Sequence, residues 1–148
     1  IWGGEKIPYL ISVENEEKED YKNRTSCVSV SFNDFKSKIK EKYNKDISDE
    51  ECKNTCINEF TTSGRVKNIK CGEFIISAEN LRVMFSLKST DFKLEIKDCN
   101  LVFNVTGYGH GIGMSQVGAD TYAHKGYNYE DIIKHYYTGV EITTLNQN

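Results

Sequence analysis

The sequence lacks internal repeats, low-complexity tracts, linker-like stretches, long apolar runs and a strong excess of either charge. Without a run of about 18 apolar residues, it offers no candidate for a membrane-spanning helix. The net charge of -3 gives no reason to expect electrostatic capture of nucleic acid. What it does have is 148 residues, with nine tyrosines and seven phenylalanines to supply buried area. These features together predict one globular domain with a core of its own.

The five cysteines form no compact ladder, and their odd number leaves at least one thiol unpaired. Cys52 and Cys56 are four positions apart, which on a helix places both thiols on one face, where they could chelate a metal. No second closely spaced cysteine or histidine pair lies nearby. Burial of the cysteines as small hydrophobic side chains is therefore the simpler expectation, and no metal ligand is assigned.

Alternating apolar and polar residues predict two half-buried strands, at 90–97 and 100–106, joined by a turn at Asp98-Cys99-Asn100. Capping signals at Ser31 and Ser48 predict two helices; the second carries Cys52, Cys56 and Phe60 on one face and ends at 61–64. Further helices are expected at 78–85, 115–123 and 129–136, and shorter strands at 7–13, 65–71, 73–76 and 140–145. This mixture predicts an α+β fold, a short-strand mixed sheet with packed helices.

The stretch after the 100–106 strand has glycine at every second position from Gly107 to Gly113. Glycines at this density permit positive φ angles and close approach of a ligand or another backbone. A dinucleotide-binding loop would need G-x-G-x-x-G inside a βαβ unit, and a phosphate-binding loop would need a closing Lys-Ser or Lys-Thr. Neither pattern is present, so the segment is a different kind of loop.

Four side chains of this loop are candidates for substrate binding: Tyr108, His110, Ser115 and Gln116. An aromatic ring combined with groups that both donate and accept hydrogen bonds is suited to a carbohydrate cleft. A glycine-rich turn with a buried, satisfied histidine explains the same residues, so both interpretations stay open. Ser115 has a second expected role, as the cap of the helix that follows it.

The sequence gives weaker support for a serine nucleophile and for a metal site. G-M-S-Q-V-G around Ser115 differs from the nucleophile elbow G-x-S-x-G because its second glycine is one place too far along. His110, His124 and His135 could gather a metal ion, but metal sites usually have more closely spaced ligands. The stretch at 135–139 is instead expected to be an aromatic helix end closed by Gly139.

Several stretches in order carry a resemblance to a known family. They are the opening W-G-G…P-Y-L-I-S-V, S-A-E-N-L-R-V-M-F (77–85), L-K-S-T-D-F (87–92), G-Y-G-H-G-I-G-M-S-Q-V-G-A (107–119), Gly126-Tyr127 and H-Y-Y-T-G (135–139). Together they resemble the C-terminal portion of the stage II sporulation protein D domain. Residues 14–64 match least and are expected to be a helical insertion in that domain.

The resemblance implies a lytic transglycosylase that cleaves peptidoglycan between N-acetylmuramic acid and N-acetylglucosamine, leaving a 1,6-anhydro end. It implies action on peptide-stripped glycan strands during sporulation engulfment, together with an amidase and membrane partner proteins. It also implies an extracytoplasmic location and an N-terminal membrane anchor. Related amidase-enhancer proteins share the domain, so a non-catalytic wall-binding module is the alternative.

In the family the proton donor is a glutamate upstream of the W-G-G segment, where this sequence opens. We therefore expect the acid upstream of Ile1 and assign no catalytic residue within the chain. An exposed carboxyl such as Glu16 or Glu50 would lack the desolvation that raises its pKa into the working range. By resemblance Tyr108 and His110 line the cleft. No cofactor is assigned, although some members of the family bind zinc.

Overall fold

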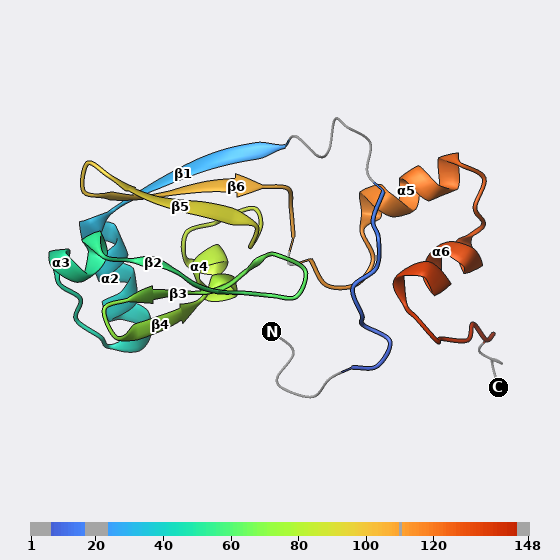
Figure 1. The fold of residues 1–148 in the computed structure, drawn as a ribbon, viewed down its shortest axis with the longest axis horizontal. Helices are drawn as coiled ribbons and strands as arrows, with labels where there is room; N and C mark the ends of the chain where they lie inside the picture. Colours follow the sequence, from blue (N-terminus) through green and yellow to red (C-terminus); the bar gives the residue numbers. More distant parts are fainter. Residues whose placement is uncertain (1–6, 17–23, 110, 145–148) are drawn as a thin grey trace. The chain divides into compact units, whose positions relative to one another are not determined.

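The structure is a computed structural model, and it describes residues 7–16, 24–109 and 111–144 (Figure 1). By their contacts these residues fall into two compact units, one made of residues 7–16 with 112–144 and the other of residues 24–109 with Gly111. The sequence predicted one domain of α+β class. The α+β class is confirmed, and the two units are described separately below.

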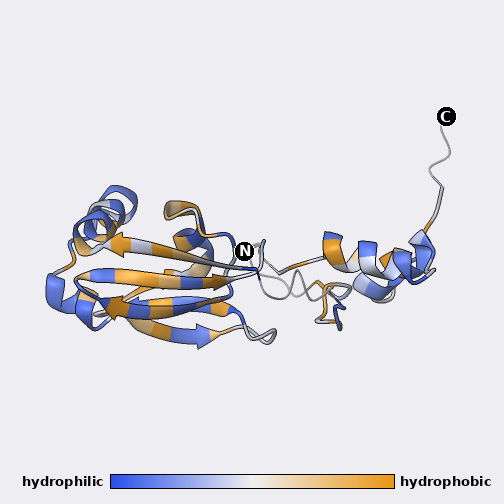
Figure 2. Cartoon of the chain, turned by 90° about the horizontal axis from the view of Figure 1, so that it is seen from above, coloured by the Kyte–Doolittle hydropathy of each residue, from blue (hydrophilic) through white to orange (hydrophobic). Residues whose placement is uncertain are grey.

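The larger unit contains two three-stranded antiparallel sheets, with strand orders β1-β6-β5 and β2-β3-β4. Its elements are, in chain order, β1 (Thr25–Ser31), α2 (Phe32–Tyr43), α3 (Asp49–Lys53), β2 (Cys56–Phe60), β3 (Val66–Cys71), β4 (Phe74–Ser77), α4 (Ala78–Met84), β5 (Phe92–Lys97) and β6 (Asn100–Thr106). Along the strands of Figure 2, hydrophobic and hydrophilic segments alternate. This alternation gives each sheet one apolar face.

The β5–β6 hairpin confirms the strand pair predicted from alternation, with Lys97 opposite Asn100 at its closed end. The turn residues Asp98 and Cys99 both have positive φ angles, 49° and 57°. Two successive left-handed residues form the tight turn that matches the twist of antiparallel strands. β1 pairs with the other edge of β6, so β6 is the central strand of this sheet.

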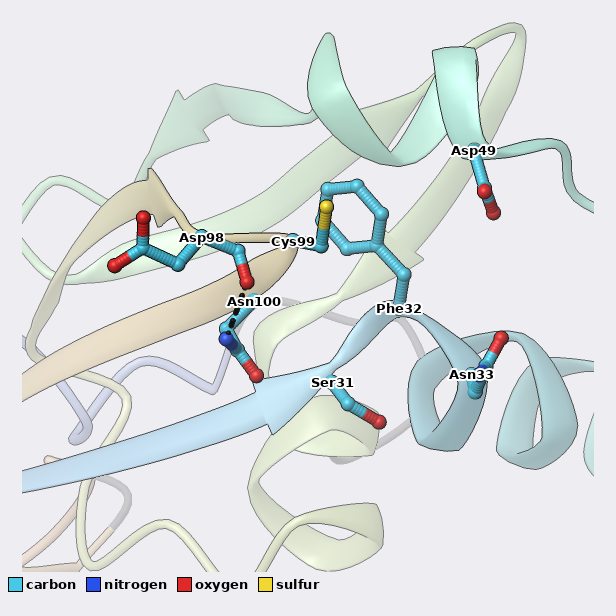
Figure 3. A pocket seen from close by; sticks show the side chains of 7 residues that line it. All are labelled: Ser31, Phe32, Asn33, Asp49, Asp98, Cys99 and Asn100. Atoms are coloured by element: carbon cyan, nitrogen blue, oxygen red, sulfur yellow. Dashed lines mark hydrogen bonds between the residues drawn. The ribbon is translucent and has the colours of Figure 1, made fainter.

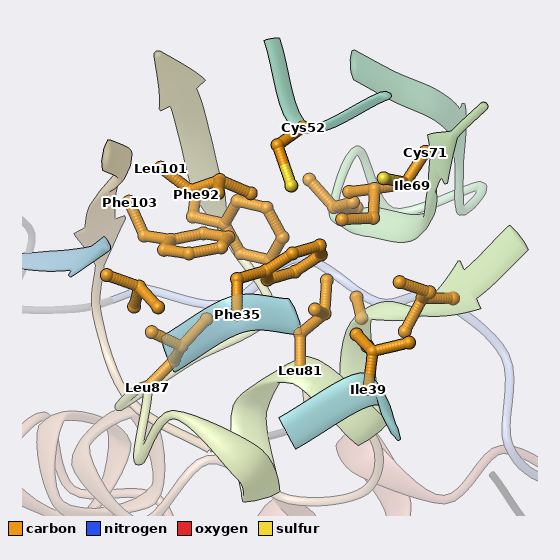
Figure 4. Close-up of a cluster of buried hydrophobic side chains, with 14 of the residues drawn as sticks. Phe35, Ile39, Cys52, Ile69, Cys71, Leu81, Leu87, Phe92, Leu101 and Phe103 are labelled. Atoms are coloured by element: carbon orange, nitrogen blue, oxygen red, sulfur yellow. The ribbon is translucent and has the colours of Figure 1, made fainter. Parts of the chain in front are cut away.

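The core of the larger unit joins the inward face of this sheet with α2, α4 and residues of β3 such as Ile69 (Figure 4). Phe103 from β6 and Phe35 and Ile39 from α2 are completely buried. The rings of Phe85 and Phe103 stack with centroids 6.1 Å apart, and Phe92 meets Phe103 edge-on at 5.3 Å. Residues 14–64 thus include strands β1 and β2 as well as helices, and α2 contributes some of the most buried side chains.

The second predicted helix is wrong in its extent, because α3 ends at Lys53. Ile57 instead pairs with Ile69 of β3, so the following residues extend as β2. Cys52 and Cys56 therefore do not share a helical face: Cys52 is buried and Cys56 is exposed on the strand. Burial raises the pKa of the Cys52 thiol to about 12, as expected for an inert core thiol.

Three further corrections concern short segments. The four residues 61–64 form the turn between β2 and β3, where the Gly64 amide donates to the Thr61 carbonyl at 3.0 Å. Residues 7–13 form no strand, because Pro8 lies in a turn closed by the Leu10 amide and the Ile7 carbonyl. Residues 140–144 are not a strand either, and residue 145 lies beyond the described part. Apolar, β-branched residues do not make a strand without a partner to pair with.

The smaller unit is built on α5 (Gln116–His124) and α6 (Tyr129–Tyr136), both close to their predicted positions. Tyr122, Ile132 and Tyr136 form its buried cluster. Gly118 fits this packing closely, since an added Cβ would overlap the side chains of Asn15 and Tyr136. Its absence of a side chain lets the segment before residue 17 pack against the helix pair.

The N-cap of α3 provides a stability test. Ser48 accepts from the Glu51 amide at 3.2 Å, and the Ser48 amide donates to the Glu51 carboxylate at 2.8 Å. Replacing Ser48 with alanine should lower the free energy of unfolding by about 1 kcal/mol, and Ser48→Gly by a few tenths. The Ser48 amide, and then its hydroxyl, lower the pKa of Glu51 from 4.5. A depressed folded-state pKa adds stability above the unfolded pKa, so part of the Ser48→Ala cost should fade as pH falls below about 4.5.

Urea unfolding of both variants at pH 7 and pH 3.5 would measure this difference. Equal costs for the alanine and glycine variants would show that the capping interaction does not stabilise α3.

Candidate functional site

The loop after β6 has the backbone that its glycines predicted. Gly107, Gly109 and Gly111 have φ angles of 67°, 76° and 73°, which only glycine adopts without strain. The Gly107 amide donates to the Arg24 carbonyl at 2.8 Å, and the Gly109 amide donates to the Lys88 carbonyl at 2.8 Å. The loop is therefore attached to two other segments of the larger unit, one before β1 and one after α4.

Tyr108 lies between these two anchor points, with about half of its side chain exposed (53%). The Lys88 ammonium is 5.2 Å from the ring centroid and 3.4 Å from the phenol oxygen. The Arg24 guanidinium carbon is 5.7 Å from the same centroid. We call Tyr108, Lys88 and Arg24 the cation–tyrosine cluster. Sequence reasoning expected Tyr108 to offer a ring face to a sugar, whereas the structure places two cations over that ring.

The cations change the acidity of the phenol. The hydrogen bond from Lys88, followed by the charge of Lys88, lowers the pKa of Tyr108 below its usual value, and Arg24 acts in the same direction. Both cations favour the phenolate over the phenol because opposite charges attract. The Tyr108 hydroxyl is therefore a better proton donor in a hydrogen bond than an ordinary tyrosine.

A third cation, Arg65, packs against the backbone of this loop. Arg65 donates from Nη1 to the Ser89 hydroxyl at 2.7 Å, and Ser89 is fully buried. Ser89 forms a parallel bridge with Gly109. An added Cβ at Gly111 would overlap the Arg65 side chain, so the guanidinium packs directly on the loop backbone. Arg65 is thus held in place on both sides.

A groove lies on the outer face of the β1-β6-β5 sheet. It has a volume of about 340 Å³ and is lined by Thr25, Ser26, Cys27, Lys93, Asn104 and Thr106. Thr25 follows Arg24 directly, and Thr106 is two residues before Tyr108. Hydroxyl and amide groups at this position are suited to the hydroxyl and acetamido groups of a glycan.

The other predicted site residues fall elsewhere. Ser115 caps α5, as expected, and accepts from the Gly118 amide at 3.1 Å. Gln116 is exposed on the first turn of α5, and both residues belong to the smaller unit. His110 lies outside the described residues. Substrate binding by His110, Ser115 and Gln116 therefore stays a prediction.

The two remaining histidines have structural contacts within the smaller unit. His135 donates from Nε2 to the Glu14 carbonyl at 2.7 Å and packs 4.8 Å from the Tyr122 ring centroid. His124 Nδ1 lies 2.8 Å from the Asp120 carbonyl oxygen. Within residues 7–16, 24–109 and 111–144, no group of three or more histidine, cysteine or acidic side chains is placed to hold a metal ion.

A second open pocket, also of about 340 Å³, lies at the opposite end of β6 (Figure 3). It lies where β1 meets α2 and is lined by residues that include Asp49, Asp98 and Asn100. Asp49 forms an ion pair with Lys36 at 2.5 Å, and the hydrogen bond from Lys36 lowers its pKa. A depressed carboxyl pKa does not suit a general acid, so this pocket is not the candidate catalytic centre.

Wherever the structure shifts the pKa of a described carboxyl group, it lowers it. The pKa values of Asp49, Glu51 and Glu59 are lowered, by Lys36, by the Ser48 cap and by Lys67 respectively. Glu16 forms an ion pair with Lys125 and is exposed. None of these four carboxyl groups has the buried, uncharged surroundings that raise a carboxyl pKa toward neutrality.

No described helix combines the length and apolar composition needed to cross a membrane. The fold and the loop define the chain as an α+β protein that presents, on a glycine-rich loop, a tyrosine with two cations over its ring. No family model matches the sequence.

Comparison with curated proteins gives relatives by sequence. Stage II sporulation protein D of Bacillus amyloliquefaciens is 38% identical over 68 residues, which is 46% of this chain and 20% of that protein. The Bacillus subtilis stage II sporulation protein D is 35% identical over 68 residues, again 46% of this chain and 20% of that protein. The Bacillus subtilis amidase enhancer is 33% identical over 87 residues, 57% of this chain and 12% of that protein. The chain is thus a relative of the stage II sporulation protein D family, and it spans about a fifth of the two sporulation proteins.

Proposed function

We propose that this chain supplies part of the glycan-binding cleft of a sporulation cell-wall protein, and that the complete protein is a peptidoglycan lytic transglycosylase. The relationship to stage II sporulation protein D carries this proposal. The described loop and groove support it: the loop presents a tyrosine hydroxyl with a lowered pKa, and the groove on the same unit is lined by hydroxyl and amide groups.

In this reaction a carboxylic acid protonates the oxygen between N-acetylmuramic acid and N-acetylglucosamine. The 6-hydroxyl of the muramic acid attacks its own C1, and the resulting carboxylate takes up the 6-hydroxyl proton. The carboxyl groups of Asp49, Glu51 and Glu59, whose pKa values are lowered, do not suit the acid role. The family resemblance is the reason for proposing an acid upstream of Ile1. Tyr108 and the groove residues would bind and orient the glycan.

The wider setting is part of the same proposal. The substrate is a strand already stripped of its stem peptides by an amidase, and the protein acts outside the membrane, held by an N-terminal anchor and assisted by membrane partner proteins. The alternative is a non-catalytic module that enhances an amidase, and the match to an amidase enhancer favours it. A buried glutamate upstream of the W-G-G segment would distinguish the enzyme from the enhancer.

The test compares the 148-residue chain with the complete protein on peptide-stripped glycan strands. We expect anhydro-muramic products from the complete protein and none from the 148-residue chain, because the proposal places the acid upstream of Ile1. His110→Ala in the complete protein should lower turnover by about 100-fold or more, the contribution typical of a proton-transfer or charge-stabilising side chain. The circular dichroism spectrum should stay unchanged.

Anhydro products from the 148-residue chain would contradict the upstream acid. Unchanged turnover of His110→Ala would remove His110 from the site. Complete absence of anhydro products, combined with faster product formation by an added amidase, would favour the enhancer.

A further inference from the structure

We propose that the cation–tyrosine cluster binds a carboxylate on the glycan, namely the lactyl carboxylate of a peptide-free N-acetylmuramic acid. The inference rests on the proposed function for the identity of the glycan, but the anion-binding chemistry is a property of the cluster itself. It assigns to Lys88 and Arg24 a role in distinguishing stripped strands from strands that still carry peptides.

The first support is the origin of the charges. Arg24 precedes β1, Arg65 precedes β3 and Lys88 follows α4, so three separate segments bring cations to the loop at 107–111. The chain as a whole has a net charge of -3, so this gathering does not follow from a generally basic composition. A local group of cations in an acidic chain is the arrangement expected of an anion site.

The second support is the direction of the hydrogen bond at Tyr108. The phenol oxygen accepts from the Lys88 ammonium at 3.4 Å, and its pKa is lowered by that contact. The phenol proton is then available for donation to a ligand oxygen. A carboxylate at this position would accept from the phenol and lie beside two positive charges, and such charge-assisted hydrogen bonds are stronger than neutral ones.

The third support is what the cations do to the ring. Lys88 and Arg24 lie over the Tyr108 ring at 5.2 and 5.7 Å from its centroid. A neutral sugar stacking on that ring would have to compete with these cation–π contacts. An anion has no such competition, because it is attracted by the same cations.

The chemistry of the strand supplies the anion. In a strand with stem peptides the lactyl carboxyl is an amide and carries no charge at that carbon. Amidase cleavage of this amide leaves a carboxylate on each muramic acid. The groove at Thr25, Asn104 and Thr106 would hold the neutral sugar groups, while the cluster would bind the new charge.

The experiment measures binding of the 148-residue chain by calorimetry to three probes at the same ionic strength. They are a peptide-free muramic-acid-containing tetrasaccharide, the same tetrasaccharide with its lactyl carboxylates amidated by methylamine, and a neutral chitotetraose. We expect the first probe to bind about tenfold more tightly than the second and third, as one charged hydrogen bond provides. Lys88→Met should remove that preference, while Lys88→Arg keeps it.

Lys97→Met is the matched control, since Lys97 is an exposed lysine at the far end of β5. It should leave the preference intact. Equal binding of all three probes would overturn the carboxylate site and leave glycan binding standing.

A second readout does not depend on the glycan. Titration with sodium lactate, followed by the Tyr108 ring resonances, should shift those signals in the unchanged chain and not in Lys88→Met. If none of the tetrasaccharides binds but lactate still shifts Tyr108, the proposed function fails and the anion site stands. If lactate has no effect and glycerol phosphate shifts Tyr108 instead, the cluster binds a phosphate and the carboxylate assignment is wrong.

Discussion

Phe103→Ala should lower the free energy of unfolding of the larger unit by about 3–5 kcal/mol. Phe103 lies at the middle of the central strand β6 and is completely buried. Its ring contacts Phe85 and Phe92 at centroid distances of 6.1 and 5.3 Å, and Phe35 stacks on Phe85 at 5.8 Å. Removing the ring therefore leaves a cavity and separates contacts between the sheet, α2 and the residue that caps α4.

The size of the effect follows from two additive terms. One is the lost free energy of burying the ring's apolar surface away from water. The other is the cavity that remains because the surrounding side chains relax only partly into the empty space. Since natural domains are stable by about 5–15 kcal/mol, this single change would use up a large share of the total. We expect the whole unfolding curve to shift cooperatively, because Phe103 and the aromatic residues around it belong to one core.

Guanidinium unfolding followed by circular dichroism would measure the change. Val102→Ala is the control, because Val102 is the neighbouring β6 residue on the outer, partly exposed face. It should cost about 1 kcal/mol or less. If both variants lose the same stability, the core does not lie on the face assigned here.

The elements that were predictable from the sequence are those specified locally. The β5–β6 hairpin follows from a strict two-residue alternation, and the starts of α2 and α3 follow from a serine with an acidic residue three positions later. These patterns report the geometry of the residues that carry them. They therefore hold whatever the rest of the chain does.

The wrong predictions concern segments whose structure depends on pairing with a strand distant in the sequence. Cys52, Cys56 and Phe60 repeat at a spacing that suits a helix, yet Cys56 and Phe60 also fit one face of a strand. Pairing of β2 with β3 selected the strand after Lys53. The segment 7–13 is as apolar as a strand but has no partner strand among the described residues.

In the candidate site, too, local features were predictable from the sequence and features that depend on distant segments were not. The glycine spacing singled out Tyr108 and the positive φ angles of its loop, since both are properties of one short stretch. Lys88, Arg24 and Arg65 were missed because each lies in a different segment and is one of 19 lysines and arginines. The groove at Thr25 and Asn104 depends on the register between β1 and β6, which no local pattern determines.

Gly111→Ala should weaken glycan binding much more than Gly109→Ala, although both substitutions carry the same backbone strain. The two φ angles are 73° and 76°, and a left-handed alanine costs roughly 1–2 kcal/mol at either position. At Gly109 an added Cβ meets nothing within 4 Å, whereas at Gly111 it overlaps the Arg65 side chain. The pair therefore separates backbone strain from displacement of the guanidinium.

Displacing Arg65 breaks its 2.7 Å hydrogen bond to Ser89, and Ser89 forms the bridge with Gly109 that anchors the loop beside Lys88. The Tyr108 hydroxyl and the two cations would then lose their fixed positions. We expect similar unfolding midpoints for the two variants, but an affinity for the peptide-free tetrasaccharide at least about tenfold lower in Gly111→Ala. Equal affinities would show that Arg65 does not position the loop, and the site would then consist of Tyr108, Lys88 and Arg24 alone.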